Sequence, residues 1–152
     1  MALLSQTEAQ ILLRKVLSFS TADECEATLT GNFGGNVRSA RNSISTAGTS
    51  ENVSLAVQSR FGKRSGLATC NEFDEASLRR CVQRAEEIAR LAPESPEYVP
   101  LLGPQTYLNP PSTGTTTLTP ANRAQAAADS INLCAAKNLT AAGFLDGGSS
   151  FQ

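Results

Sequence analysis

Residues 52–93 read "NVSLAVQSRFGKRSGLATCNEFDEASLRRCVQRAEEIARLAP", and the hydrophobic period of this stretch changes half-way along it. In its first part Val53, Leu55 and Val57 alternate with polar or small residues, which is typical of a half-buried strand. After Asp74 the apolar residues recur every three or four positions, which indicates an amphipathic helix that ends at Pro93. This change of period predicts an α+β fold.

Upstream of this stretch the sequence predicts one more helix and two more strands. A helix is expected over about residues 6–18, with Ser5 and Glu8 in capping-box positions. Residues 24–31 and 37–46 are expected to be strands separated by a turn at Gly34–Gly35. With strands over residues 52–61 and 67–73, short connections predict an antiparallel meander of about four strands.

Downstream, the composition divides the chain. Residues 1–92 are expected to form an N-terminal α+β domain, and residues 93–119 a proline- and threonine-rich linker in which Leu101 and Leu102 pin the chain to that domain. Thr119-Pro120 then predicts a helix start, with helix to about residue 137 and a strand after it. Because one helix and one strand cannot bury their own apolar faces, residues 120–152 are expected to begin a domain that this chain does not complete.

Composition argues against several classes of function. The net charge is −1, so the sequence gives no reason to expect a nucleic-acid partner or an anionic membrane surface, and the basic residues near position 63 are interpreted as a solvated turn. The sequence shows neither a signal peptide nor an apolar run of the roughly 20 residues that span a bilayer. We therefore expect a cytoplasmic protein without a membrane partner.

The chain contains no histidine, which excludes a histidine base and an imidazole-ligated zinc site in these 152 residues. Its four cysteines show no C-x-x-C spacing and are interpreted as buried structural thiols. An enzyme that uses Cys70 or an Asp/Glu pair is the weaker alternative, because acidic residues near helix starts are explained by the helix dipole alone.

The order of these elements resembles the N-terminal region of the TldD/PmbA family, also named for modulation of DNA gyrase. The stretch "NVSLAVQSRFGKRSGLATCNEFD" is similar to that family's strand, glycine, small-residue strand and Asp before a helix. The helix "LRRCVQRAEEIARLAPESPEY" with its proline-rich exit and the segment "GPQTY" extend the resemblance over about residues 5–150. No single one of these motifs is diagnostic.

The resemblance implies a metallopeptidase that acts in proteolysis. Family members pair as two related subunits, of which one binds zinc through H-E-x-x-x-H and the other lacks a working site; in that motif two histidines hold zinc and the glutamate acts as base. These residues belong to a C-terminal half that this chain lacks, so no catalytic, metal or cofactor residue is assigned here. Zinc is expected in the parent protein only if that protein is the catalytic subunit type.

The resemblance implies that this chain serves subunit assembly and peptide access. Its expected partners are a homologous subunit, with which it forms a homo- or heterodimer, and a peptide or unfolded protein. We expect strands 36–46 and 51–61 to offer a surface to an extended peptide or to the partner subunit. Its candidate residues are Ser39, Arg41, Asn42, Ser45 and Arg60. The alternatives are an ordinary solvated sheet face and a stand-alone binding or regulatory module with no peptidase role.

Overall fold

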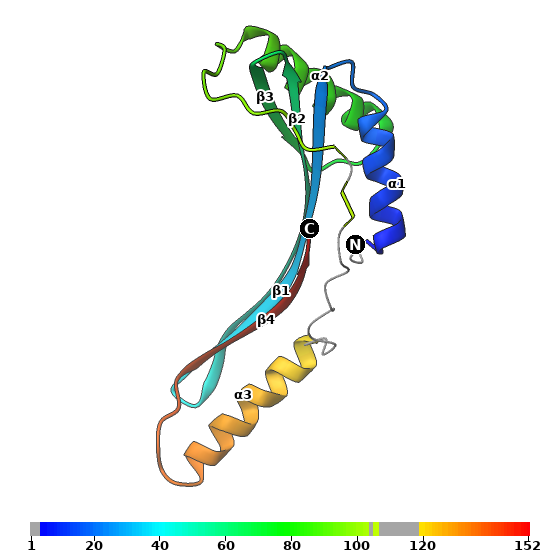
Figure 1. The fold of residues 1–152 in the computed structure, drawn as a ribbon. Coiled ribbons are helices and arrows are strands. Elements are labelled where there is room, and N and C mark those ends of the chain that lie inside the picture. The colour runs from blue at the N-terminus through cyan, green and yellow to red at the C-terminus, as the bar shows by residue number, and fades with distance from the viewer. Residues whose placement is uncertain (1–3, 104, 107–118) are drawn as a thin grey trace. The chain divides into compact units, whose positions relative to one another are not determined.

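The computed structural model describes residues 4–103, 105, 106 and 119–152, and it shows the α+β fold that the sequence predicts (Figure 1). Its elements are α1 (Gln6–Leu17), β1 (Glu24–Ala40), β2 (Ser43–Phe61), β3 (Arg64–Cys70), α2 (Glu75–Leu91), α3 (Pro120–Ala135) and β4 (Gly143–Phe151). The strands form one sheet in the order β3-β2-β1-β4. Contacts divide the chain into two compact units, one with residues 32–52 and 119–151 and one with residues 4–31 and 53–106.

The strand boundaries differ from the predicted ones. β1 continues through Gly34 and Gly35, where a turn was expected, and the chain reverses at Arg41 and Asn42 instead. Both turn residues have positive φ, 51° and 58°, which suits the tight turn that joins two twisted antiparallel strands. The glycine prediction was wrong because a glycine can also serve a strand where another group approaches the backbone closely. The three predicted strands over residues 24–61 are therefore two long ones.

The unit with α1, β3 and α2 holds a hydrophobic core between the two helices and the sheet. The capping box that the sequence predicts is present on α1 at Ser5 and Glu8. The Asp74 side chain caps α2 and accepts from the Ser77 N–H at 3.0 Å. Gly66 of β3 lies against the α2 backbone, so that a Cβ there would collide with Ala85 and Ala89. The apolar residues of this core are Val16, Leu29, Val53, Leu55, Val57, Leu78, Cys81, Val82, Ala85 and Ala89.

In the other unit, α3 lies beside the strands and carries a half-buried, mostly apolar stripe. Thr119 caps the helix through Asn122, and Pro120 occupies its first turn. The stripe consists of Ala124, Ala127, Ala128, Ile131 and Cys134. The most buried residue of α3 was not predicted: Arg123 is only 1% exposed and donates a hydrogen bond to the Thr49 hydroxyl at 3.2 Å.

The proline-rich segment is described only in part, since residue 104 and residues 107–118 lie outside the described chain. Its described part is attached to the strands by backbone groups. The Ser95 N–H donates to the Lys63 carbonyl at 2.9 Å, and the Leu101 N–H donates to the Glu24 carboxylate at 3.1 Å. Leu101 is half-buried but Leu102 is 83% exposed, so only the first of the two leucines is attached as expected.

Candidate peptide and partner surface

Asn42, a predicted surface residue, holds the turn between β1 and β2 to the segment that precedes β4. Its side-chain N–H donates to the Leu139 carbonyl at 3.0 Å, and its side-chain oxygen accepts from the Ala141 N–H at 2.5 Å. Its backbone N–H donates to the Ala141 carbonyl at 3.2 Å. Asn42 tolerates the left-handed conformation and satisfies three hydrogen bonds at once, so its main role is to fix this corner of the sheet.

The other predicted residues near the turn differ in whether their side chains form hydrogen bonds within the sheet. The Ser39 hydroxyl donates to the Gly143 carbonyl of β4 at 3.5 Å, and the Ser45 hydroxyl donates to the Arg38 carbonyl at 3.2 Å. Both hydroxyls therefore have partners inside the sheet. Arg41 is exposed at the tip of the turn. Of the residues near the turn, Arg41 is the one that best suits contact with an external ligand.

Arg60 belongs to the other unit and takes part in an internal ion pair. Its guanidinium lies 3.3 Å from the Glu24 carboxylate, and its side chain is only 18% exposed. Burial alone would raise the pKa of Glu24, but hydrogen bonds from the Leu101 N–H, the Tyr98 hydroxyl and Arg60 outweigh it, so this pKa is lowered. Arg60 thus supports the attachment of the proline-rich segment, and the structure does not group it with Ser39, Arg41, Asn42 and Ser45.

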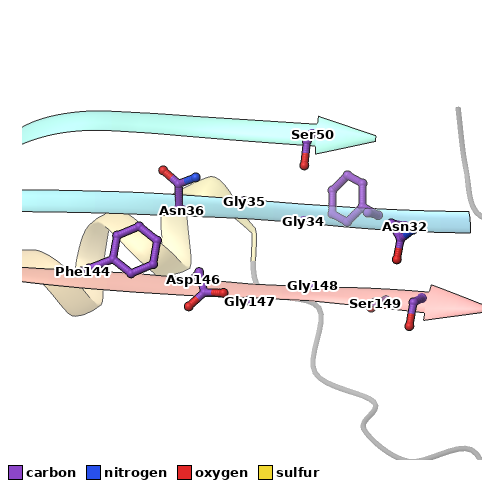
Figure 2. Close-up of a pocket in the computed structure, with 12 residues that line it drawn as sticks. Asn32, Gly34, Gly35, Asn36, Ser50, Phe144, Asp146, Gly147, Gly148 and Ser149 are labelled. Atoms are coloured by element: carbon purple, nitrogen blue, oxygen red, sulfur yellow. The ribbon is translucent and has the colours of Figure 1, made fainter. Parts of the chain in front are cut away.

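Sequence reasoning missed a polar trough between β1, β2 and β4, which Figure 2 shows in close-up. The trough has a volume of about 400 Å³. Its floor is formed by glycines of two paired strands, and Gly148 lies so close to the Phe33 carbonyl that a side chain there would collide with it. Its lining residues are Asn32, Phe33, Gly34, Gly35, Asn36, Ser50, Phe144, Asp146, Gly147, Gly148, Ser149 and Ser150.

An aromatic side chain and a carboxylate line this trough. The Arg38 guanidinium lies 5.1 Å from the centroid of the Phe144 ring, and Phe144 is 57% exposed. The Asp146 carboxylate and the Asn36 amide line the trough nearby (Figure 2). The trough thus offers hydrogen-bonding groups and one exposed ring to a ligand that lies along the strands. The sequence feature that could have indicated this trough is the presence of two glycine pairs in polar surroundings, Gly34-Gly35 and Gly147-Gly148.

β2 also carries an exposed edge. Its pairing with β3 runs from Leu55 to Phe61, so Ser43–Asn52 lies outside that register. All of the residues from Ser43 to Asn52 are exposed. β1 occupies the other side of β2, so within the described residues no strand is registered against the outer side of Ser43–Asn52. Unpaired backbone N–H and C=O groups on such an edge can pair with another extended chain.

The described residues show neither the ligand cluster of a metal site nor a helix of the membrane-spanning kind. Across 4–103, 105, 106 and 119–152, no three Cys, Asp or Glu side chains gather where they could hold a metal ion. None of the described helices is long and apolar enough to cross a membrane.

Part of this chain matches a known protein family. Residues 25–89 match the model of the PmbA/TldA metallopeptidase domain 1. This part of the chain is similar to the first domain of that metallopeptidase family. The matched residues run from the start of β1 to near the end of α2, and the family resemblance that the sequence suggested is confirmed.

Solved structures share this fold over almost the whole chain. TldE from Thermococcus kodakarensis is 19% identical with a TM-score of 0.71, and the match covers 93% of this chain and 37% of that one. A candidate modulator of a DNA gyrase from Thermotoga maritima is 10% identical with a TM-score of 0.64, over 92% of this chain and 38% of that one. A second candidate modulator, from Bacteroides thetaiotaomicron, is 11% identical with a TM-score of 0.65, over 97% and 36%.

This chain therefore spans little more than a third of the length of the solved structures that it matches. At these identities the likeness establishes the fold alone. No curated protein matched the sequence.

Proposed function

We propose that this chain is the non-catalytic first domain of a PmbA/TldD-type zinc metallopeptidase system in the cytoplasm, where it serves subunit assembly and peptide access. The observation that carries the proposal is the exposed edge of β2 over Ser43–Asn52. The family match over residues 25–89 supports the link to a metallopeptidase. Zinc, if the parent is the catalytic subunit type, would be held by residues outside this chain, which has no histidine.

An unfolded peptide is a suitable occupant of the β2 edge. Pairing through backbone groups does not depend on the peptide's side chains, so it tolerates many sequences. Glu51 is the only charged residue from Ser43 to Asn52, and the segment has neither lysine nor proline, the residues that commonly block an edge. The trough beside Ser50 supplies further polar contacts for the side chains of such a peptide.

Backbone pairing can be tested with a fluorescent extended peptide and a copy of it that is N-methylated at alternate residues. The methyl groups remove N–H donors on one edge while the side chains stay the same. Fluorescence anisotropy measures the affinity of each peptide. We expect the affinity of the methylated copy to be at least roughly tenfold lower, as the loss of two or more net hydrogen bonds implies. Equal binding of the two peptides would reject the β2 edge as the peptide site.

Arg41→Glu tests the adjoining turn, because Arg41 is exposed and no internal ion pair is known to depend on it among the described residues. We expect weaker binding of acidic peptides, or of a homologous partner subunit, with little change in folding. Arg60→Glu is unsuitable for this test, because it would place a second carboxylate beside Glu24 and disturb the fold itself.

The stand-alone binding module remains the second candidate, and one observation favours it. α3 packs within its own unit with Arg123 only 1% exposed, as a self-sufficient segment would. Limited proteolysis of the chain distinguishes the two. Resistance of residues 119–152 in the isolated chain, together with peptide binding that no homologous subunit alters, would favour the module over the peptidase domain.

A further inference from the structure

One side of β3 faces α2 and places a cysteine against that helix. Burial alternates along the strand: Gly66 is buried and Ala68 and Cys70 are half-buried, while Leu67 and Thr69 are exposed. Gly66 abuts the α2 backbone at Ala85 and Ala89, so the side that it shares with Cys70 is the side covered by α2.

A second cysteine meets the first one from the helix. Cys81 lies one helical turn before Ala85 on the buried stripe of α2 and is 5% exposed. Burial raises the pKa of the Cys81 thiol to about 12, with a further contribution from a hydrogen bond to Cys70. Cys70 and Cys81 thus lie on the facing sides of β3 and α2, one half-buried at the end of the strand and one in the core. Neither residue has a role in the proposed peptide surface.

We propose that Cys70 and Cys81 form a dithiol modification site, which a low-molecular-weight disulfide such as oxidised glutathione converts into a disulfide that joins β3 to α2. The site differs from the proposed peptide surface, so its test is independent of that function. Adjacent thiols on packed elements are what thiol–disulfide exchange requires, because the second step is intramolecular. The irregular spacing of the cysteines in the sequence gave no sign of this pair.

The exchange proceeds in two balanced steps. The Cys70 thiolate, which is the more exposed of the two sulfurs, attacks one sulfur of oxidised glutathione, so that a protein–glutathione disulfide forms and one glutathione thiolate leaves. The Cys81 sulfur then attacks the Cys70 sulfur, and the second glutathione leaves and takes up the proton that Cys81 gives up. The protein loses two electrons and two protons, and one oxidised glutathione becomes two reduced ones.

The sequence allows a direct test on the unmodified chain. Trypsin cleaves after Arg64, Arg79, Arg80 and Arg84, so Cys70 lies in the peptide 65–79 and Cys81 in the peptide 81–84. After incubation with oxidised glutathione and alkylation of the remaining thiols, we expect mass spectrometry to find these two peptides joined and to lose the link on reduction. Cys25 and Cys134 are expected to be alkylated.

Two substitutions separate the steps. Cys81→Ser should arrest the reaction with one glutathione on Cys70, whereas Cys70→Ser should leave Cys81 unmodified in the folded protein. Cys134→Ser is the matched control and should form the Cys70–Cys81 link as the wild type does. A wild-type protein that retains glutathione on Cys70 without closing, or a link that involves Cys25 or Cys134, would overturn the proposal.

Discussion

The Glu86 carboxylate accepts hydrogen bonds from the Thr21 backbone N–H at 2.6 Å and from the Thr21 hydroxyl at 2.8 Å. Ser20 and Arg90 donate to the same carboxylate, at 3.1 Å each, and the Glu86 side chain is only 7% exposed. Burial alone would raise the pKa of Glu86, but these donors outweigh it and the pKa is lowered below 4.5. One buried carboxylate thus fastens the loop between α1 and β1 to α2.

We expect Glu86→Gln to lower the free energy of unfolding by about 1–3 kcal/mol, because an amide presents one acceptor where the carboxylate presents two and leaves buried donors unpaired. Urea unfolding at neutral pH measures the change. Glu87→Gln is the matched control, since Glu87 is exposed and its ion pair with Arg84 is exposed as well. If both variants lost the same free energy of unfolding, Glu86 would have no special role in attaching this loop to α2.

The same carboxylate predicts the direction of a pH dependence. Because the pKa of Glu86 is lower in the folded state, its contribution is complete above the unfolded value near 4.5 and disappears as the pH falls through the folded value. The wild type should therefore lose stability on acidification more steeply than Glu86→Gln. Urea midpoints measured from neutral pH to below 4 test this, and parallel curves for the two proteins would refute it.

Glu24 is expected to control the attachment of the proline-rich segment. Its carboxylate accepts from the Leu101 N–H and pairs with Arg60, so Glu24→Gln should release residues around Leu101 while β1 and β2 stay paired. Hydrogen exchange of the Leu101 amide should become faster, by about five- to thirtyfold for a loss of roughly 1–2 kcal/mol. Glu26→Gln is a control on the same strand, and an equal effect there would argue against a specific attachment.

The sequence revealed local structure much better than it revealed the surface. The helix starts at Ser5 and Thr119 and the apolar stripe of α2 depend on neighbours within a few residues, and these predictions hold. The trough depends on Gly148 lying against Phe33, a contact between residues more than a hundred positions apart. The Gly34–Gly35 error has the same origin, since only the close approach of the distant Arg123 side chain explains glycine at position 35 of β1.

The turn at Arg41 and Asn42 gives a prediction in which two adjacent residues respond in opposite directions. Arg41→Asn should stabilise the protein by up to about 1 kcal/mol, because asparagine adopts positive φ more readily. Asn42→Ala should destabilise it by about 1–3 kcal/mol, because it removes the side chain that bonds Leu139 and Ala141 and imposes positive φ on alanine. Thermal unfolding of both variants measures these changes. If Asn42→Ala stabilised the protein, Asn42 would not fix the turn as inferred from its hydrogen bonds.

Two adjacent glycines of β1 should respond differently to the same substitution. A methyl group at Gly35 would collide with the buried Arg123 guanidinium, whereas at Gly34 its nearest neighbour would be the Gly147 carbonyl at 3.7 Å. We expect Gly35→Ala to cost about 1–3 kcal/mol, as overpacking does, and Gly34→Ala to change stability little. Urea unfolding compares the two variants.

A double-mutant cycle with Arg123→Met tests the cause of the Gly35→Ala loss. Methionine is shorter than arginine and leaves room for the new methyl group, so Gly35→Ala should cost less in the Arg123→Met background than in the wild type. Losses that simply add would show that the methyl group does not act through Arg123. The cause would then lie in the strand itself, and Gly34→Ala would be expected to share it.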